Sequence, residues 1–229
     1  MNWISFTAAG IAVYLAIAIL VCGVIFHLIN CWRQRPRYVR ASNATGNGGL
    51  LSLSWSEFSL GKKIFVIALL ATSLGLFLGH TRIFGDLGLV LNLFGEENLD
   101  RIGHILGTGL GIFFFVAVGY LLLRRIASPR KEQSRPKDYL LLSLVLLLVL
   151  LGNYLRIIRP FGLEDYRAYM ASLVAFSPAF PETIASSSWR WLLTGHVFTA
   201  SLFFAYLPFS GFVPSIYDFV RRCLKHNQQ

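Results

Sequence analysis

Five long, almost wholly apolar stretches constrain the fold of this chain more than any other feature of its sequence. They cover residues 4–30, 64–83, 105–123, 139–158 and 191–213. Each is long enough to cross the hydrocarbon core of a bilayer, which takes roughly 17–25 residues of helix. Because no water is available there to bond the backbone, such segments must be helical. We therefore expect an all-α integral membrane bundle of five transmembrane helices, with residues 1–229 forming one membrane domain.

The charges between these stretches predict the orientation of the bundle. Segments 32–63 and 124–138, together with the C-terminal tail, hold fifteen of the 21 Lys and Arg residues and only four acids. The remaining six arginines are balanced by seven acids. Cationic loops stay on the cytoplasmic side, so we expect the N-terminus outside and the C-terminus in the cytoplasm. The net charge of +10 is then a topology signal within membrane lipid, and we expect no nucleic-acid partner.

Three histidines, His80, His104 and His196, each directly follow a glycine in or beside an apolar stretch. They lie 17, 20 and 18 residues from the cytoplasmic ends of their helices, marked by Lys63, Arg124 and Pro214. At a rise of 1.5 Å per residue, all three rings lie about 25–30 Å above that boundary. Ionisable groups inside a membrane usually mark a function. The sequence therefore predicts a cluster of imidazoles in the outer part of the bundle.

A haem b held by two axial imidazoles fits this pattern, because small residues let helix backbones approach a flat macrocycle. The glycines with suitable spacing are Gly75 and Gly79, then Gly103, Gly107 and Gly111, and finally Gly195. The competing interpretation is that GxxxG spacing is common in any membrane bundle and that single histidines near helix ends are structural. His27 is assigned such a structural role.

Other cofactors and functions fit less well. No carboxylate or thiolate lies near the three histidines in sequence to complete a zinc or copper site. Cys22, Cys31 and Cys223 lack the spacing of a covalent haem or an iron–sulfur cluster. The cores of the five stretches contain no acid or lysine, which a proton-driven transporter normally keeps.

Outside the membrane, residues 163–174 form a possible amphipathic helix that would lie in the outer interface and cover a binding site. Arg82, Asp86 and Arg156 lie at the outer ends of the second and fourth apolar stretches. They are candidates to bind quinone oxygens or haem propionates, against the simpler interpretation that they are helix-end charges.

Three sequence blocks resemble the membrane cytochrome b family that contains the nitrate reductase gamma subunit. They are similar, more closely still, to the cytochrome subunit of dissimilatory sulfite-reduction and heterodisulfide-reductase-like membrane complexes. The resemblance covers about residues 62–214. The blocks are "LGHTRIFGD", "LLLRRIASPR" and "LVAFSPAFPETIASSSWRWLLTGHVFTASLFFAYLPFS".

The resemblance implies an electron-transfer subunit in the prokaryotic cytoplasmic (inner) membrane. Such a subunit would oxidise menaquinol or ubiquinol and exchange electrons with a cytoplasmic iron–sulfur subunit, within an oxidoreductase complex that can hold further redox subunits. A haem-free membrane anchor for a soluble redox enzyme is the alternative.

The resemblance also implies haem ligands. In the nitrate reductase pattern, two b haems use four histidines, and His80 and His196 match two of these. The other two positions hold Leu70 and the segment 176–178, which have no histidine, and His104 lies outside the pattern. We therefore expect one haem iron rather than two, with its metal ligands drawn from His80, His196 and His104 in that order. Gly79, Gly195 and Arg82 are expected to line the cofactor site.

Overall fold

The computed structural model describes residues 6–33, 60–81, 96–127 and 136–210, and these residues contain helices and no strand. The predicted all-α class is confirmed for this part of the chain. The predicted span ends at residues 4, 83 and 213 lie outside the described residues, as do residues 34–59 of the predicted cytoplasmic loop 32–63, Arg82 and Asp86.

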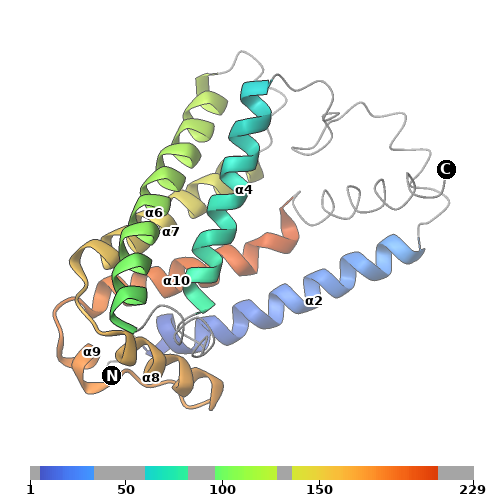
Figure 1. The fold of residues 1–229 in the computed structure, drawn as a ribbon. Helices are drawn as coiled ribbons and strands as arrows, with labels where there is room; N and C mark the ends of the chain where they lie inside the picture. Colours follow the sequence, from blue (N-terminus) through green and yellow to red (C-terminus); the bar gives the residue numbers. More distant parts are fainter. Residues whose placement is uncertain (1–5, 34–59, 82–95, 128–135, 211–229) are drawn as a thin grey trace.

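Seven α-helices make up the described part of the chain (Figure 1). The five long ones are α2 (Ala12–Arg33), α4 (Leu60–Thr81), α6 (Glu96–Ala127), α7 (Pro136–Ile158) and α10 (Arg190–Tyr206). The two short ones are α8 (Leu163–Val174) and α9 (Glu182–Ser186). A π-helical turn, Thr7–Ile11, leads into α2, and a 3₁₀ turn, Leu207–Phe209, follows α10.

Four segments of the described helices are long and apolar enough to cross a membrane. They are Thr7–Asn30, Arg101–Ala127, Tyr139–Ile158 and Arg190–Phe209. The apolar part of α4, Ile64–His80, is shorter. Its 17 residues cover about 25 Å as a helix, against a hydrocarbon core of about 30 Å. A membrane crossing by α4, the total of five spans and the orientation of the termini therefore stay predictions.

Several predicted boundaries differ from the observed ones, most of all those of the third and fifth stretches. The third stretch was expected at 105–123, but α6 continues at both ends, from Glu96 to Ala127. Hydropathy marks the part of a helix that lies in hydrocarbon, and charged residues continue a helix beyond it. The fifth stretch was expected to end at residue 213, but α10 gives way to the 3₁₀ turn at Leu207. Pro208 explains this, because proline has no N–H to continue the α-helical pattern.

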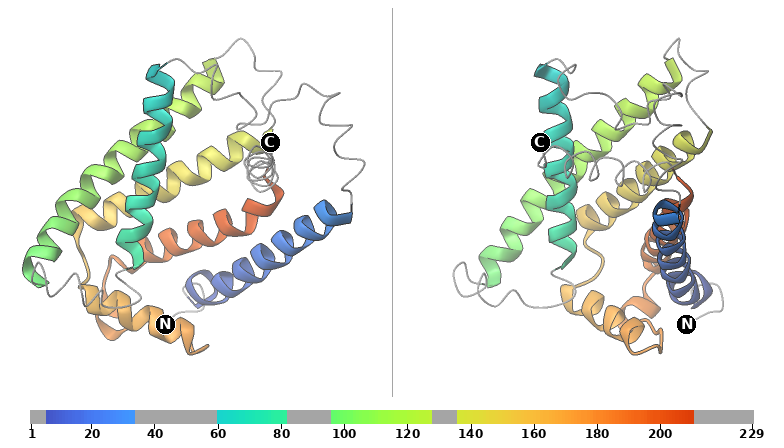
Figure 2. Two further views of the ribbon diagram at one scale, coloured as in Figure 1. Left: turned by 45° about the vertical axis from the view of Figure 1, so that its right-hand side comes forward. Right: turned by 90° about the vertical axis from the view of Figure 1, so that its right-hand side faces the viewer.

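The long helices pack in the order α4, α6, α7, α10, α2, each against the next (Figures 1 and 2). Their outward surfaces expose many large apolar side chains, as expected of helices surrounded by lipid. α8 and α9 lie across one end of the bundle, beside the N-terminal end of α2. The buried core cluster lies at that end: Ala9, Leu155, Phe161, Tyr169, Leu173, Phe180, Ile184, Leu192 and Leu193.

The helix predicted at residues 163–174 is confirmed as α8. Its first turn is capped by Asp165, whose Oδ2 accepts a hydrogen bond of 2.9 Å from the amide of Gly162. The other oxygen, Oδ1, accepts one of 2.5 Å from the hydroxyl of Thr183 beside α9. The Tyr169 hydroxyl donates to the carbonyl of Ala9, which ties α8 to the start of the first span.

Candidate functional site

Two of the three predicted imidazoles lie close together. The His80 ring, on the last turn of α4, and the His196 ring, on the second turn of α10, have centroids 6.4 Å apart and planes inclined by 14°. α4 packs along α6, and α10 packs along α7 and α2. The histidine pair therefore joins two helices that do not pack extensively on each other.

The His80 ring is oriented by its own helix. Its Nδ1 lies 2.7 Å from the carbonyl oxygen of Leu76, one turn earlier. A carbonyl only accepts hydrogen bonds, so Nδ1 carries the proton and Nε2 keeps its lone pair. Histidines that bind metals are held in this way, with one nitrogen bonded to a backbone carbonyl and the other to the metal.

The His196 ring fits against α7 at a glycine. A Cβ placed on Gly152 would lie 3.0 Å from Cε1 of His196 and 3.5 Å from its Nδ1. The ring also interacts with the backbone of Leu148, one turn before Gly152. Nδ1 is buried, and no hydrogen bond of standard geometry reaches it from the described residues. Sequence analysis missed Gly152, because nothing near it in sequence relates it to a histidine on another helix.

The separation of the two rings suits a metal with axial imidazoles. An imidazole nitrogen lies about 2 Å from its metal and the ring centre about 1.2 Å further, so two opposite imidazoles have centroids about 6–6.5 Å apart. Within the described ranges, no group of three or more His, Cys, Asp or Glu side chains is placed to hold a metal ion. Two histidines alone are too few for a zinc site but suffice for a haem, which needs the protein only at its axial positions.

The predicted glycines divide into two groups. A Cβ on Gly79 would meet nothing within 4 Å, and one on Gly195 would only touch Leu151 at 3.8 Å. Gly79 therefore borders open space beside His80, whereas Gly195 packs at ordinary contact distance from Leu151 of α7. A Cβ on Gly75, in contrast, would lie 2.9 Å from Leu110 of α6, so Gly75 serves the contact between α4 and α6.

The prediction that the α6 glycines approach a macrocycle is wrong for two of them. A Cβ on Gly107 would lie 1.7 Å from Nη1 of Arg156, and one on Gly111 would lie 2.0 Å from Oδ1 of Asn153. Both partners come from α7. Nη1 of Arg156 also donates a 2.9 Å hydrogen bond to the carbonyl of Gly103. The stripe therefore accommodates polar side chains of the neighbouring helix.

The remaining predicted residues lie apart from the pair or outside the described part of the chain. His104 makes no ring contact with His80 or His196 among the described residues. Arg82 falls outside those residues.

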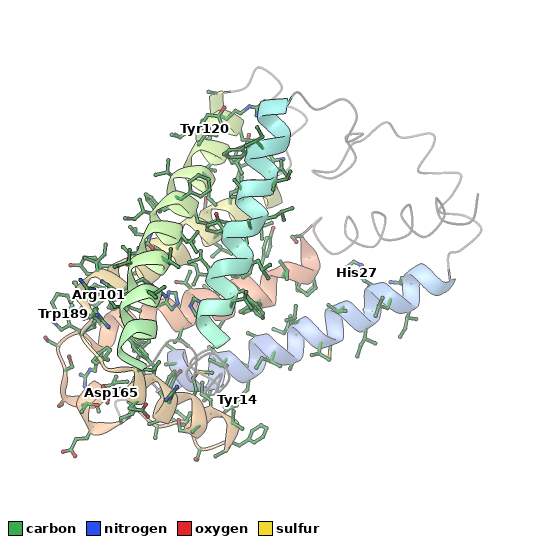
Figure 3. The ribbon with its side chains drawn as sticks, viewed as in Figure 1. Tyr14, His27, Arg101, Tyr120, Asp165 and Trp189 are labelled. Atoms are coloured by element: carbon green, nitrogen blue, oxygen red, sulfur yellow. The ribbon has the colours of Figure 1, made fainter. Side chains whose placement is uncertain are left out.

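His27 lies elsewhere, toward the other end of α2 (Figure 3). Its Nε2 is 2.8 Å from the carbonyl of Pro208. Pro208 also packs against Gly23, where a Cβ would lie 2.4 Å from the proline ring. Gly23 and His27 thus hold the end of α10 against α2, and this geometry agrees with the structural role predicted for His27.

Fold and site together define a multi-pass helical membrane protein in which an exposed imidazole of α4 is paired with a more buried one of α10. The model of the nitrate reductase gamma subunit family matches residues 7–221, and the chain belongs to this family. It is also similar to an Hdr-like menaquinol oxidoreductase cytochrome b-like subunit of Archaeoglobus profundus, with 28% identity over 122 residues. That match covers 50% of this chain and 36% of the relative's length. The family and the relative indicate a membrane redox subunit of the prokaryotic cytoplasmic membrane.

Proposed function

We propose that this chain is the haem b-containing membrane subunit of a respiratory redox complex. It exchanges electrons between the quinone pool, menaquinone or ubiquinone, and a cytoplasmic iron–sulfur subunit of the heterodisulfide reductase-like kind. The proposal includes α4 as a fifth span, with the N-terminus outside and the C-terminus in the cytoplasm. The similarity to a menaquinol oxidoreductase subunit of Archaeoglobus profundus supports menaquinol as a substrate class.

One observation carries the proposal: imidazoles from two separate membrane helices lie with their ring planes nearly parallel and their centroids 6.4 Å apart. His80 and His196 are the proposed axial ligands of a single haem, which would supply a one-electron redox centre within the bundle. The Leu76 carbonyl holds the proton of His80 on Nδ1, which would leave Nε2 as the nitrogen available for ligation. Gly79 borders open space beside His80, and we propose that Gly79 and Gly195 line the haem site. His104 is not required in this arrangement.

The test is to purify the wild-type chain and the variants His80→Ala, His196→Ala and His104→Ala from membranes. Haem per chain is then measured by pyridine haemochrome assay, together with the reduced-minus-oxidised spectrum. We expect about one haem per chain in the wild type and in His104→Ala, and at least a tenfold loss in the other two variants. His104→Ala is the matched control, since it removes a membrane imidazole from the adjacent helix.

Two results would contradict the proposal. Full haem content in both His80→Ala and His196→Ala would show that the ligands lie elsewhere. A wild-type chain purified without any haem from haem-replete cells would favour the haem-free membrane anchor.

A further inference from the structure

The turn after α8 exposes large apolar side chains at one end of the bundle. Val174 is 70% exposed and Phe176 is 82% exposed. The charges of α8 lie only in its first half, at Glu164, Asp165 and Arg167, and residues 168–181 carry none. The helix therefore runs from a polar, water-compatible end to an apolar one. Neighbouring exposed apolar side chains on an uncharged segment form an apolar patch, and such patches are typical of protein or membrane contact sites.

The depth of Phe176 follows from its partner on the first span. The rings of Phe176 and Tyr14 stack with centroids 5.4 Å apart and planes inclined by 18°. Tyr14 lies seven residues beyond Thr7, where the 24-residue apolar segment Thr7–Asn30 begins. At 1.5 Å per residue, Tyr14 is about 10 Å along a segment of about 36 Å.

The apolar segment exceeds a hydrocarbon core of about 30 Å by only about 6 Å. Even if the whole excess projected at the Thr7 end, Tyr14 would lie about 4 Å inside the hydrocarbon. A tilt shortens the projection of the helix on the membrane normal but leaves the thickness of the hydrocarbon core unchanged, so it does not bring Tyr14 out of the hydrocarbon. Phe176, stacked on Tyr14, therefore lies at membrane depth too.

The turn is held firmly in this position. The Tyr14 hydroxyl donates a 2.8 Å hydrogen bond to the carbonyl of Leu173. Ser172 Oγ lies 3.0 Å from the Ala179 carbonyl and accepts a 3.1 Å bond from the Ala179 amide. Pro178 packs against Gly10, where a Cβ would lie 2.9 Å from the proline ring.

The backbone at Phe176 gives a second, independent indication. Its φ of 55° lies in the left-handed region, where glycine ends a helix without strain and a bulky residue is strained. The chain places an exposed phenylalanine there. Burial of the aromatic ring in an apolar environment outside the protein would offset this backbone strain.

We propose that the segment Val174–Pro178 inserts into the lipid leaflet at the N-terminal end of α2, so that α8 descends obliquely from the aqueous surface into the bilayer. The partner is the acyl and glycerol region of that leaflet, to which the same end of the first span also exposes Ile11, in the π-helical turn, and Leu15, on α2, at 40% and 57%. The assignment is independent of the haem.

The test uses a full-length chain in which Cys22, Cys31 and Cys223 are serine. Phe176→Cys is labelled with a nitroxide and reconstituted in phosphatidylcholine–phosphatidylglycerol liposomes. Power-saturation EPR then compares collisions with oxygen, which concentrates in lipid, with those of a water-soluble nickel chelate. Glu182→Cys is the control, because it lies on α9 at the same end of the molecule and is exposed. We expect an oxygen-to-nickel ratio at least threefold higher at position 176, and equal ratios would overturn the proposal.

A photo-crosslinking measurement keeps the aromatic ring in place. Benzoylphenylalanine at position 176 is irradiated in native membranes, and the adducts are identified by mass spectrometry. Phospholipid adducts are expected. Adducts with another protein in place of lipid would overturn the proposal and identify this turn as a subunit contact.

Discussion

At the scale of single residues, the environment of a histidine separates a site from a structural contact. His27 bonds to the carbonyl of Pro208, and this contact fixes two helices. His80 turns its Nδ1 back to its own helix, which leaves its other nitrogen without that bond, and its ring lies beside His196. The two histidines are both in apolar helices, so only the partner of each ring distinguishes their roles.

Gly152 provides the residue-scale prediction. Gly152→Ala puts a methyl group 3.0 Å from His196 Cε1, which is too close for the ring to keep its position. The ring must shift by a few tenths of an ångström, and so we expect haem content to fall severalfold or the reduced spectrum to shift. Haemochrome assay and redox titration measure this.

Gly109→Ala is the matched control for Gly152→Ala, because a Cβ at Gly109 meets nothing within 4 Å. It should bind haem like the wild type. A Gly152→Ala variant with unchanged haem content, spectrum and midpoint potential would contradict the assigned role of this glycine.

At the scale of elements, α6 and α7 are joined by polar side chains of α7 that occupy the space beside glycines of α6. Arg156 occupies the space beside Gly107, and Asn153 occupies the space beside Gly111. Polar groups between membrane helices hold neighbours together because lipid offers them no other partner. The stripe predicted from sequence to face a cofactor thus serves helix association.

Gly111→Ala tests this contact. The added methyl would lie 2.0 Å from Asn153 Oδ1, and overpacking of this kind costs about 1–3 kcal/mol. We expect a lower thermal unfolding midpoint in detergent. Gly119→Ala on the same helix should be tolerated, since its Cβ would touch Leu146 at 3.8 Å. Equal midpoints for the two variants would show that the α6–α7 contact relaxes without loss.

The α8 element carries a pH dependence. Burial, followed by the neighbouring Asp165 carboxylate, raises the pKa of Tyr166 to about 12, and Arg156 opposes this shift. Unfolded tyrosine ionises near pH 10. The unfolded state therefore loses its proton first, and the stability that Tyr166 contributes is lost as pH rises from about 10 to 12.

Unfolding followed between pH 8 and 12 should show this loss, and Tyr166→Phe should reduce its slope. Burial also raises the pKa of Tyr169, so part of the slope remains in that variant. An identical slope in wild type and Tyr166→Phe would exclude Tyr166 as a source.

At the scale of the whole molecule, α4 is the long helix that packs least against the rest of the described bundle. It packs along α6, and its tip reaches α10 through the two histidine rings. On the proposed function, a shared iron is the main connection between α4 and α10. A ligand that binds only the folded arrangement stabilises it.

Removal of haem should therefore loosen α4 more than the other helices. Hydrogen–deuterium exchange of chain purified from haem-deficient cells should show faster exchange in peptides from α4, with α7 and α10 changed much less. Uniform exchange across the five long helices, with and without haem, would contradict this connection.

The sequence by itself determined which segments are helical and apolar, that the protein is a multi-pass membrane protein, and that α8 exists. These properties depend on the transfer of about twenty consecutive residues into lipid and on local capping, and both can be read along the chain. The structure showed that Gly107 and Gly111 face α7, which periodicity alone did not reveal.

Only the tertiary structure decided which rings meet. His80, His104 and His196 each follow a glycine and have a similar predicted depth, so hydropathy and spacing do not distinguish them. The pairing depends on how each helix is rotated about its axis and against which helix it packs. Those angles are set by contacts between residues far apart in sequence, such as Gly152 with His196 and Arg156 with Gly107.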